Sequence, residues 1–380
     1  MTNPRSTRVT LKTVAQLAGV SRSTASRVLT GHPSVSPEVM RAVKRAARTL
    51  DYVPSQAGRA LATGRSDAVT LVIFESTTFL FGDPFLGRLV HGIDEVLALG
   101  ERQLVLLAPH AGSEPDRLDR YLAGAHGEGV LMVSLHGSHP LPGRLAARGI
   151  PVVFGGRPPD PDHFSYVDVD NRGGALAAVS HLASGGRRTI ATITGPQDMP
   201  AGYDRMLGWR SALEAAHLAA DDDLAEPGDF TRAGGVRAMR TLLQRRPGLD
   251  AVFVASDTMA SGALQVLAGA GRRVPEDVAV VGFNDDPLAE TTYPPLSSVR
   301  QPVEEMGREM VQLLLELIRT PHGARRRVVL STQLQVRRSS ATPGQEGPGV
   351  TEGYRIEAIH TDIDRQLTRA PRDGRALLPR

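Results

Sequence analysis

The sequence predicts two structural parts, a small all-α head and a much larger α/β body that is divided into two lobes. Three observations predict them. Short helical patterns separated by turn residues fill the first 54 residues. Short apolar runs alternate with amphipathic helices from residue 69 onward. The head is strongly basic, whereas the rest of the chain is acidic.

The head contains three predicted helices. The first follows the N-cap candidate Thr10, carries apolar residues at spacings of three and four, and is ended by Gly19. Ser21 caps a second, short helix, and Ser36 caps a third whose first helical residue is a proline. The third helix stops near Tyr52. Two short helices joined by a glycine turn indicate a helix-turn-helix.

The body follows an alternating pattern of strands and helices. The apolar runs are Val69–Phe74, Leu104–Ala108, Val130–Val133, Val152–Phe154, Ile190–Ile193, Ala251–Ala255 and Val278–Val281. The helical stretches between them include Phe85–Leu99, Ala175–Ala183, Arg205–Ala216 and Met259–Leu267. Continuous apolar strands with crossover helices predict parallel sheets that are covered on both faces. The region spans about 270 residues, which favours two α/β lobes over one sheet.

The charge is distributed unevenly along the chain. Residues 1–65 hold nine arginines and two lysines against Glu38 and Asp51, a net charge of +9. Because the whole chain carries +3, the remaining residues carry −6. A compact basic head on an acidic body is typical of a nucleic-acid-binding module, although a solvated charged face has the same composition.

Composition and motifs exclude several classes of function. The chain has no cysteine, which rules out disulfides, thiol nucleophiles and cysteine-ligated metals. No apolar stretch follows the basic residues in Met1–Val9, and none is long enough to cross a bilayer, so we expect a soluble, cytoplasmic protein without membrane contact. No phosphate-binding, nucleophile-elbow, metalloprotease or dinucleotide motif occurs. We therefore expect no enzyme, cofactor or metal, and we expect His136 and His139 to be solvated.

The segment Val9 to Arg65, which begins VTLKTVAQLAGVSRSTASRVL, resembles the signature of the LacI/GalR family of repressors. The body segments VDVDNRGGA, SDTMASGAL, VGFNDDPLAE and YPPLSSVRQP, together with Arg205–Trp209, resemble the landmarks of the family's sensor domain. The resemblance covers about residues 9 to 338. It implies a periplasmic-binding-protein-like sensor and a homodimer that binds a pseudo-palindromic operator until a small-molecule effector releases it.

The resemblance also divides the chain into four parts. Residues 9–54 form the helix-turn-helix domain, and 55–66 form a hinge helix and linker. Residues 67–340 form the effector-binding and dimerisation domain. Residues 341–380 form a tail that we expect to be disordered or to contain one short helix.

A helix-turn-helix places the N-terminal end of its second helix in the major groove. The resemblance makes Arg22, Ser23 and Arg27 the base readers, since arginine can form two hydrogen bonds to guanine. The residues that it assigns to holding the DNA backbone are Thr10, Ser21, Thr24 and Ser26. The alternative is that both arginines contact phosphate only.

The hinge segment Ser55–Thr63 is implied to fold into a helix on DNA and to pair with its copy in the dimer. Leu61 occupies the position that inserts into the minor groove, where an apolar wedge kinks the duplex. The alternative for Leu61 is ordinary helix packing. Gly58 replaces the usual alanine and weakens the free helix by about 1 kcal/mol.

The resemblance places an effector between the two lobes, near the carboxyl ends of the strands, as open parallel sheets favour. Carboxylates and amides there can pair with ligand hydroxyls, an arginine can donate to them, and phenylalanine rings can stack on the ligand. The candidate effector-binding residues are Asp83, Phe85, Arg205, Phe230, Asp257 and Asn284.

Some of these residues have plain structural alternatives. Phe85 and Phe230 can belong to the core. Asp257 can cap the helix that follows it, and Asp170 and Asn171 can do the same for theirs. For Asp170 we favour the cap.

Two further alternatives concern polar residues. Arg205 can pair with Asp204 or Glu214 on the surface. Most family members have aspartate at the position of Asn284, so the neighbouring Asp285 can share its role.

The planar polar groups and aromatic faces favour a carbohydrate effector. The stretch Phe81–Phe85 is similar to that of regulators that respond to plant-polysaccharide disaccharides, which suggests a cellobiose-like sugar. An arginine between two phenylalanines also fits a purine, so a nucleobase-responsive, co-repressed regulator of the same family is the alternative. A secreted solute-binding protein would lack the basic head, and a DNA-architectural protein would not need the two lobes.

Overall fold

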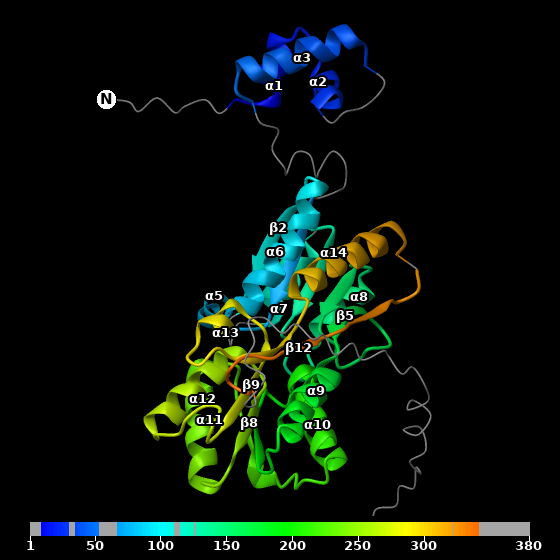
Figure 1. Cartoon of the computed structure of the whole chain (residues 1–380). Coiled ribbons are helices and arrows are strands. Elements are labelled where there is room, and N and C mark those ends of the chain that lie inside the picture. Colours follow the sequence, from blue (N-terminus) through cyan, green and yellow to red (C-terminus); the bar gives the residue numbers. More distant parts are fainter. Residues whose placement is uncertain are drawn as a thin grey trace, which may run out of the picture.

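The computed structural model describes residues 9–29, 35–52, 67–109, 115–124, 127–321 and 323–341. They form a three-helix head and a body of two α/β lobes, as the sequence predicts (Figure 1). The hinge segment Ser55–Thr63, with Gly58 and Leu61, and the tail from residue 342 lie outside the described residues.

The head consists of α1 (Leu11–Leu17), α2 (Arg22–Leu29) and α3 (Pro37–Thr49). Thr10 and Ser36 cap α1 and α3, and Gly19 provides the turn between the first two helices with a φ of +67°. The helices enclose a small apolar core of Val14, Ala15, Ala25, Val28, Val43, Ala46 and Ala47. The small side chains let the three short helices pack closely.

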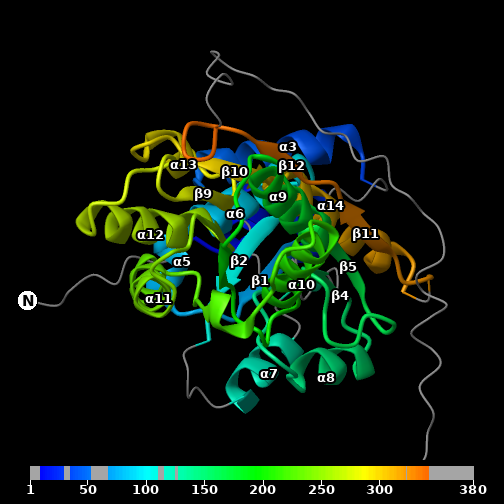
Figure 2. The same cartoon turned by 60° about the horizontal axis from the view of Figure 1, so that its bottom comes forward.

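The N-terminal lobe contains a six-stranded sheet in the order β11-β5-β4-β3-β1-β2, and every pair in it is parallel. Its strands are β1 (Ala68–Ile73), β2 (Gln103–Leu107), β3 (Gly129–Val133), β4 (Val152–Gly155), β5 (Ser165–Val169) and β11 (Arg327–Leu330). Its helices are α5 (Thr77–Gly82), α6 (Pro84–Leu99), α7 (Pro115–Ala123), α8 (Leu141–Ala147) and α14 (Val303–Arg319). The paired helices α6 and α14 share one apolar core with the sheet, whereas α7 and α8 cover its other face (Figure 2).

The C-terminal lobe repeats this plan in a sheet of order β12-β10-β9-β8-β6-β7, in which only β12 runs antiparallel to its neighbour. Its strands are β6 (Ile190–Thr194), β7 (Ala225–Pro227), β8 (Ala251–Val254), β9 (Ala279–Asn284), β10 (Ser297–Arg300) and β12 (Gln333–Gln335). Its helices are α9 (Asn171–Ser184), α10 (Pro200–Ala215), α11 (Arg232–Arg245), α12 (Asp257–Gly269) and α13 (Pro287–Thr291). The pair α9 and α10 lies on the opposite side of the sheet from α11 and α12 (Figure 1).

All seven predicted apolar runs form strands. The strands that the apolar pattern did not predict are β5, β7, β10, β11 and β12. They are short or rich in polar residues, as in the SYVDV sequence of β5. Tertiary pairing fixes such strands, because their own sequences carry little hydrophobic signal.

The chain passes between the lobes three times, after β5, after β10 and after β11. These crossovers connect the lobes, and in both sheets the parallel strands end toward the space between them. The side chains that follow the strand ends therefore meet there, as open parallel sheets favour.

Candidate functional site

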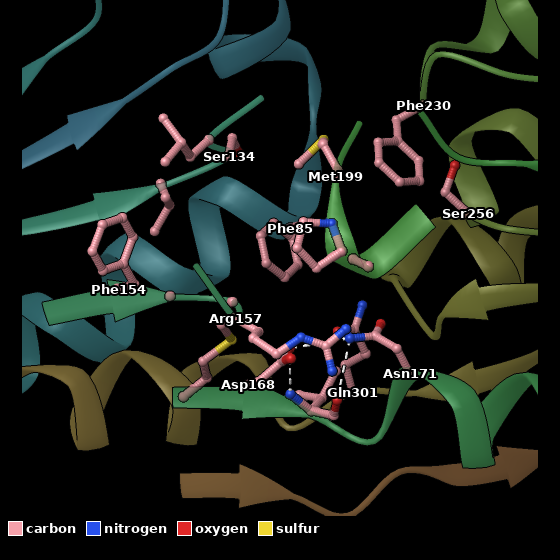
Figure 3. Close-up of a pocket in the computed structure, with 18 of the residues that line it drawn as sticks. Phe85, Ser134, Phe154, Arg157, Asp168, Asn171, Met199, Phe230, Ser256 and Gln301 are labelled. Carbon is pink, nitrogen blue, oxygen red and sulfur yellow. Dashed lines mark hydrogen bonds between the residues drawn. The ribbon is translucent and has the colours of Figure 1, made fainter. Parts of the chain in front are cut away.

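A cavity lies between the two lobes and is lined by residues from both (Figure 3). Its walls come from segments at or after the ends of β1, β3, β4 and β5 in one lobe and of β6, β7, β8, β9 and β10 in the other. Five of the six predicted effector-binding residues line it, namely Asp83, Phe85, Arg205, Phe230 and Asn284.

Arg205 is the central cation of the cavity. Although its side chain lines the cavity, only 5% of the residue is exposed. Its Nε donates to Asn171 Oδ1 at 2.9 Å and its Nη1 donates to the carbonyl oxygen of Ala255 at 2.6 Å. Its guanidinium lies 3.8 Å from the ring centroid of Phe283 and 5.8 Å from that of Phe230. Such a group is held in place before any ligand arrives.

Two consequences follow for Arg205. Among the described residues, no oxygen accepts from its Nη2, so this nitrogen can donate to a ligand. Burial lowers its pKa to about 10, which still leaves it charged at neutral pH. The alternative of surface pairing with Asp204 or Glu214 is wrong, because Arg205 is buried and Asp204 pairs instead with Arg157 at 2.7 Å.

Two acidic side chains face this cation. Asp83 caps α6 by accepting from the backbone N–H of Phe85 at 3.0 Å, and burial raises its pKa to about 6. Asp168, at the end of β5, accepts from Asn171 Nδ2 at 3.1 Å, and burial raises its pKa as well. Asp168 was not among the residues predicted from the sequence, and Asn171 was predicted only as a possible helix cap. The alternation of polar and apolar residues in VDVDN was the only local signal.

The backbone at the cavity is strained. Ser134, Phe230 and Asn284 all line the cavity, and their φ values are +57°, +60° and +119°. Positive φ is uncommon for residues other than glycine and concentrates at functional sites. This geometry aims the Phe230 ring toward Arg205.

Both polar atoms of the Asn284 side chain have protein partners. Its Nδ2 donates to Asp286 Oδ2 at 3.2 Å and its Oδ1 accepts from Gln301 Nε2 at 2.5 Å. Asp285 does not share its place, because the Asp285 carboxylate pairs with Arg300 and Arg337. The alternative role for Asp285 is therefore wrong.

Asp257 is the one predicted effector-binding residue that the structure does not place in the cavity. It is fully buried, and its carboxylate accepts from the Ser298 hydroxyl at 2.6 Å and from the backbone N–H of Asp286 at 2.8 Å. Burial raises its pKa well above the usual value. The helix cap is Ser256, which accepts from the backbone N–H of Met259 and also lines the cavity. The helix cap that we favoured for Asp170 is confirmed at α9.

Aromatic and apolar side chains form the rest of the wall. Phe85 and Phe154 line the cavity from the N-terminal lobe, and Met199 and Phe230 line it from the C-terminal lobe (Figure 3). Rings combined with a few fixed donors and acceptors are typical of a site for a small polar molecule that has apolar faces.

The second candidate site is the exposed surface at the start of α2. Arg22, Ser23 and Arg27 are exposed there. The Ser21 hydroxyl lies 2.8 Å from both the Ser23 and the Thr24 hydroxyls, and it accepts from the backbone N–H of Thr24 at 3.1 Å. The structure therefore presents both arginines and a hydroxyl cluster on one exposed face. Thr10, the cap of α1, is also exposed, whereas Ser26 is half-buried.

The expectation that His136 is solvated is wrong. His136 is half-exposed and bonded to Glu75 and Asp198, with distances of 3.1 and 3.0 Å. Within the described ranges there is no group of three or more metal-ligating side chains. In the same ranges, no helix has the length and apolar character that crossing a membrane requires.

Comparison with known proteins gives matches over both parts of the chain. Residues 10–55 match the profile of bacterial regulatory proteins of the lacI family, and residues 179–340 match that of a periplasmic binding protein-like domain. The HTH-type transcriptional regulator CelR of Thermobifida fusca is 51% identical over 340 residues, which cover 88% of this chain and 99% of CelR. The ribose operon repressor of Escherichia coli K12 is 33% identical over 338 residues, which cover 87% of this chain and 99% of that protein.

Solved structures agree with these matches. A transcriptional regulator CelR–cellobiose complex is similar with a TM-score of 0.71 and 49% identity, covering 87% of this chain and all of that one. The lac repressor dimer bound to operator and an anti-inducer has a TM-score of 0.78 at 24% identity, covering 88% and 99% of the two chains, and so supports the fold. With relatives of this identity aligned over most of its length, the chain is a member of the lacI family of bacterial regulatory proteins.

Proposed function

We propose that this regulator represses transcription by binding a pseudo-palindromic operator as a homodimer and that a sugar, cellobiose or a closely related disaccharide, releases it. The observation that carries the proposal is the cavity around Arg205, whose wall combines this fixed cation, the carboxyl groups of Glu75, Asp83 and Asp168, and phenylalanine rings. Sugar hydroxyls pair with such polar groups, and the apolar faces of the sugar rings stack on aromatic side chains. CelR, which is half identical to this chain, has been solved as a complex with cellobiose.

The DNA part of the proposal rests on α2. Arg22, Ser23 and Arg27 contact bases in the major groove, and the residues that hold the DNA backbone are Thr10, Ser21, Thr24 and Ser26. Exposed arginines at the start of a recognition helix support this assignment. A dimer presents two such helices, which matches a two-fold operator.

The test combines calorimetry with operator binding by the full-length chain. The operator is selected from a pool of palindromic duplexes, and cellobiose is then titrated into the free protein and into the complex. We expect cellobiose to bind and to lower operator affinity roughly 5- to 150-fold, as for couplings of about 1–3 kcal/mol. By reciprocity, operator DNA lowers cellobiose affinity by the same factor. Failure of cellobiose to bind would reject the disaccharide, and binding without any effect on DNA would reject the release mechanism.

A purine effector that increases operator affinity is the second candidate. The observation that favours it is the guanidinium of Arg205 between the rings of Phe230 and Phe283. Because Phe283 is fully buried, only one of these rings is open to a stacked base. Guanine and hypoxanthine in the same titration decide between the two effectors.

The hinge is the proposed switch between effector and DNA. The segment Ser55–Thr63 is too short to be a stable helix alone, and Gly58 weakens it further. We expect Gly58→Ala to tighten operator binding and to require more effector for release. Leu61→Ala is expected to weaken specific binding more than nonspecific binding, since only a bent operator receives the wedge. Unchanged operator affinity in both variants would exclude the hinge as the switch.

A further inference from the structure

One side chain outside the cavity wall connects the two lobes beside it. His136 follows β3 of the N-terminal lobe, and its Nε2 lies 3.1 Å from Oε1 of Glu75, which follows β1 of the same lobe. Its Nδ1 lies 3.0 Å from Oδ2 of Asp198, which precedes α10 of the C-terminal lobe. The backbone N–H of Gly137 donates to the carbonyl oxygen of Asp198 at 2.9 Å, so a second hydrogen bond connects the same two segments across the lobes.

Both ends of this bridge reach the cavity. The side chain of Glu75 is 16% exposed and lines the cavity, and Met199, which follows Asp198, lines it from the other lobe. His136 itself does not line the cavity. His136 therefore lies between Glu75 of the cavity wall and Asp198 of the C-terminal lobe.

We infer that His136 is a positioning residue for ligand binding, which holds the Glu75 carboxylate in the cavity wall and joins it to Asp198 of the other lobe while the lobes are closed against each other. The inference rests on the proposed function, because it takes the cavity as the effector site. When the lobes separate, Nδ1 of His136 loses Asp198, and the ring that positions Glu75 is then held through Nε2 only.

The protonation state of His136 follows from its two partners. Carboxylates accept hydrogen bonds, and only the imidazolium form donates from both ring nitrogens. The hydrogen bond to Glu75, together with that to Asp198, raises the pKa of His136 above its usual 6.5. Lobe opening removes Asp198, so the pKa of His136 is lower in the open form than in the closed form. At a pH between these two values, closure of the lobes is accompanied by protonation of His136. Ligand affinity then falls as pH rises through that interval.

The other charged groups near this bridge behave differently. His139 lies on the same loop, but burial lowers its pKa and its Nδ1 accepts from the backbone N–H of Leu141. Asp83 lies close to Glu75, and burial raises its pKa to about 6. The pair Arg157–Asp204 is a second link between the lobes.

The first experiment measures cellobiose affinity by calorimetry between pH 6.5 and 8.5 for the wild type, His136→Gln and His163→Gln. His163 pairs with Asp160 in the same way, but within one exposed loop, so its substitution is the matched control. We expect wild-type and His163→Gln affinity to fall about fivefold over this range, a typical effect of one titrating histidine. His136→Gln is expected to bind more weakly at pH 6.5 and to lose that dependence, while Asp83 contributes equally to all three proteins. Equal pH profiles in wild type and His136→Gln would overturn the inference.

The second experiment needs no ligand. Because the chain has no cysteine, spin labels can be placed at Ala147→Cys on α8 and Ala215→Cys on α10, which are exposed in different lobes. The distance distribution of the full-length protein is expected to shift toward longer separations as pH rises, and this shift is expected to disappear with His136→Gln. A shift that persists in this variant overturns the role of His136. If wild-type protein does not bind cellobiose but shows the His136-dependent shift, the effector proposal fails and the role of His136 in closure stands.

Discussion

The recognition surface of α2 and the cavity around Arg205 use the same kind of side chain in opposite ways. Arg22 and Arg27 are exposed on the head, whereas Arg205 is buried and already bonded to Asn171 and Ala255. The hydroxyls beside the exposed arginines bond to one another. The polar groups of the cavity are instead fixed by partners from several distant segments.

The difference follows from the two ligands. DNA is a large polyanion, and exposed arginines gain affinity from counterion release and base contacts without being buried beforehand. A small neutral ligand offers few contacts, so the protein must hold its donors and acceptors in place before binding. Substitutions in one region are therefore expected to leave the function of the other intact.

The largest expected effect is that of Arg205→Ala on ligand binding. Loss of a buried charged donor is expected to cost about 3 kcal/mol, or roughly 100-fold in affinity. Operator affinity without ligand is expected to stay the same, since the arginine lies in the body. Calorimetry with cellobiose and a gel shift measure the two quantities.

Arg205→Ala also leaves Asn171 without its partner, so thermal unfolding must show that the variant is folded. Arg205→Lys is the second variant, because it keeps the charge but loses the planar donor set. Undiminished cellobiose affinity in both variants, when they are folded, would remove Arg205 from the site.

Asp83→Asn tests how much the buried carboxylate of Asp83 destabilises the folded protein. The pKa of Asp83 is raised to about 6, so its protonated form is favoured in the folded state. The group stabilises the fold at low pH, and this contribution is lost as pH rises through about 6. Asparagine keeps the helix cap without the charge. The variant is expected to be about 2 kcal/mol more stable than wild type at pH 8 and equal to it below pH 4.

Denaturant unfolding at the two pH values checks this prediction. Asp94→Asn on α6 is the control, since its carboxylate is exposed. An equal gain at both pH values would mean that the effect does not arise from ionisation.

Arg27→Ala is the counterpart of Arg205→Ala on the head. It is expected to cost about 2 kcal/mol in operator affinity and to relax the preference at one base pair. Cellobiose affinity of the free protein is expected to stay the same. Affinities for a set of single-base operator variants check this, and a uniform loss over the set would identify a phosphate contact instead.

The smallest effect is expected from Ser21→Ala. Ser21 accepts from the backbone N–H of Thr24 at the start of α2, and loss of such a cap costs about 1 kcal/mol of helix stability. Operator affinity is expected to fall only modestly, while the body unfolds as in wild type. Ser21→Asn, which can cap equally well, is expected to restore the stability of the head. A loss of operator affinity in both variants would show that the Ser21 hydroxyl contacts DNA itself.

The head was predicted from the sequence because the residues that define its helices lie close together along the chain. Caps, the turn at Gly19 and the apolar spacing lie within about 45 residues, and α1, α2 and α3 begin and end close to the positions that these signals indicate. The strongly apolar strands of both lobes were predicted for the same reason. The polar β5 and the three-residue β12 were not, because only their neighbours in the sheet define them.

The cavity was predicted in part. Resemblance located Asp83, Phe85, Arg205, Phe230 and Asn284, whereas Glu75 had no signal, and Asp168 and Asn171 had only the local pattern of VDVDN. Asp257 looked equivalent to Asn284, since both follow the end of a strand. In the folded chain its carboxylate accepts from Ser298 and Asp286 behind the cavity wall.

The sequence by itself determined the helix-turn-helix, the alternation of strands and helices and the basic charge of the head. The tertiary structure decided which polar side chains line the cavity and which are hydrogen-bonded within the protein. It also decided that His136 meets Asp198 across the two lobes. The physical reason is range: helix and strand signals act over a few residues, whereas burial and hydrogen-bond partners come from distant segments, as for Arg88 and Glu304, which are 216 residues apart.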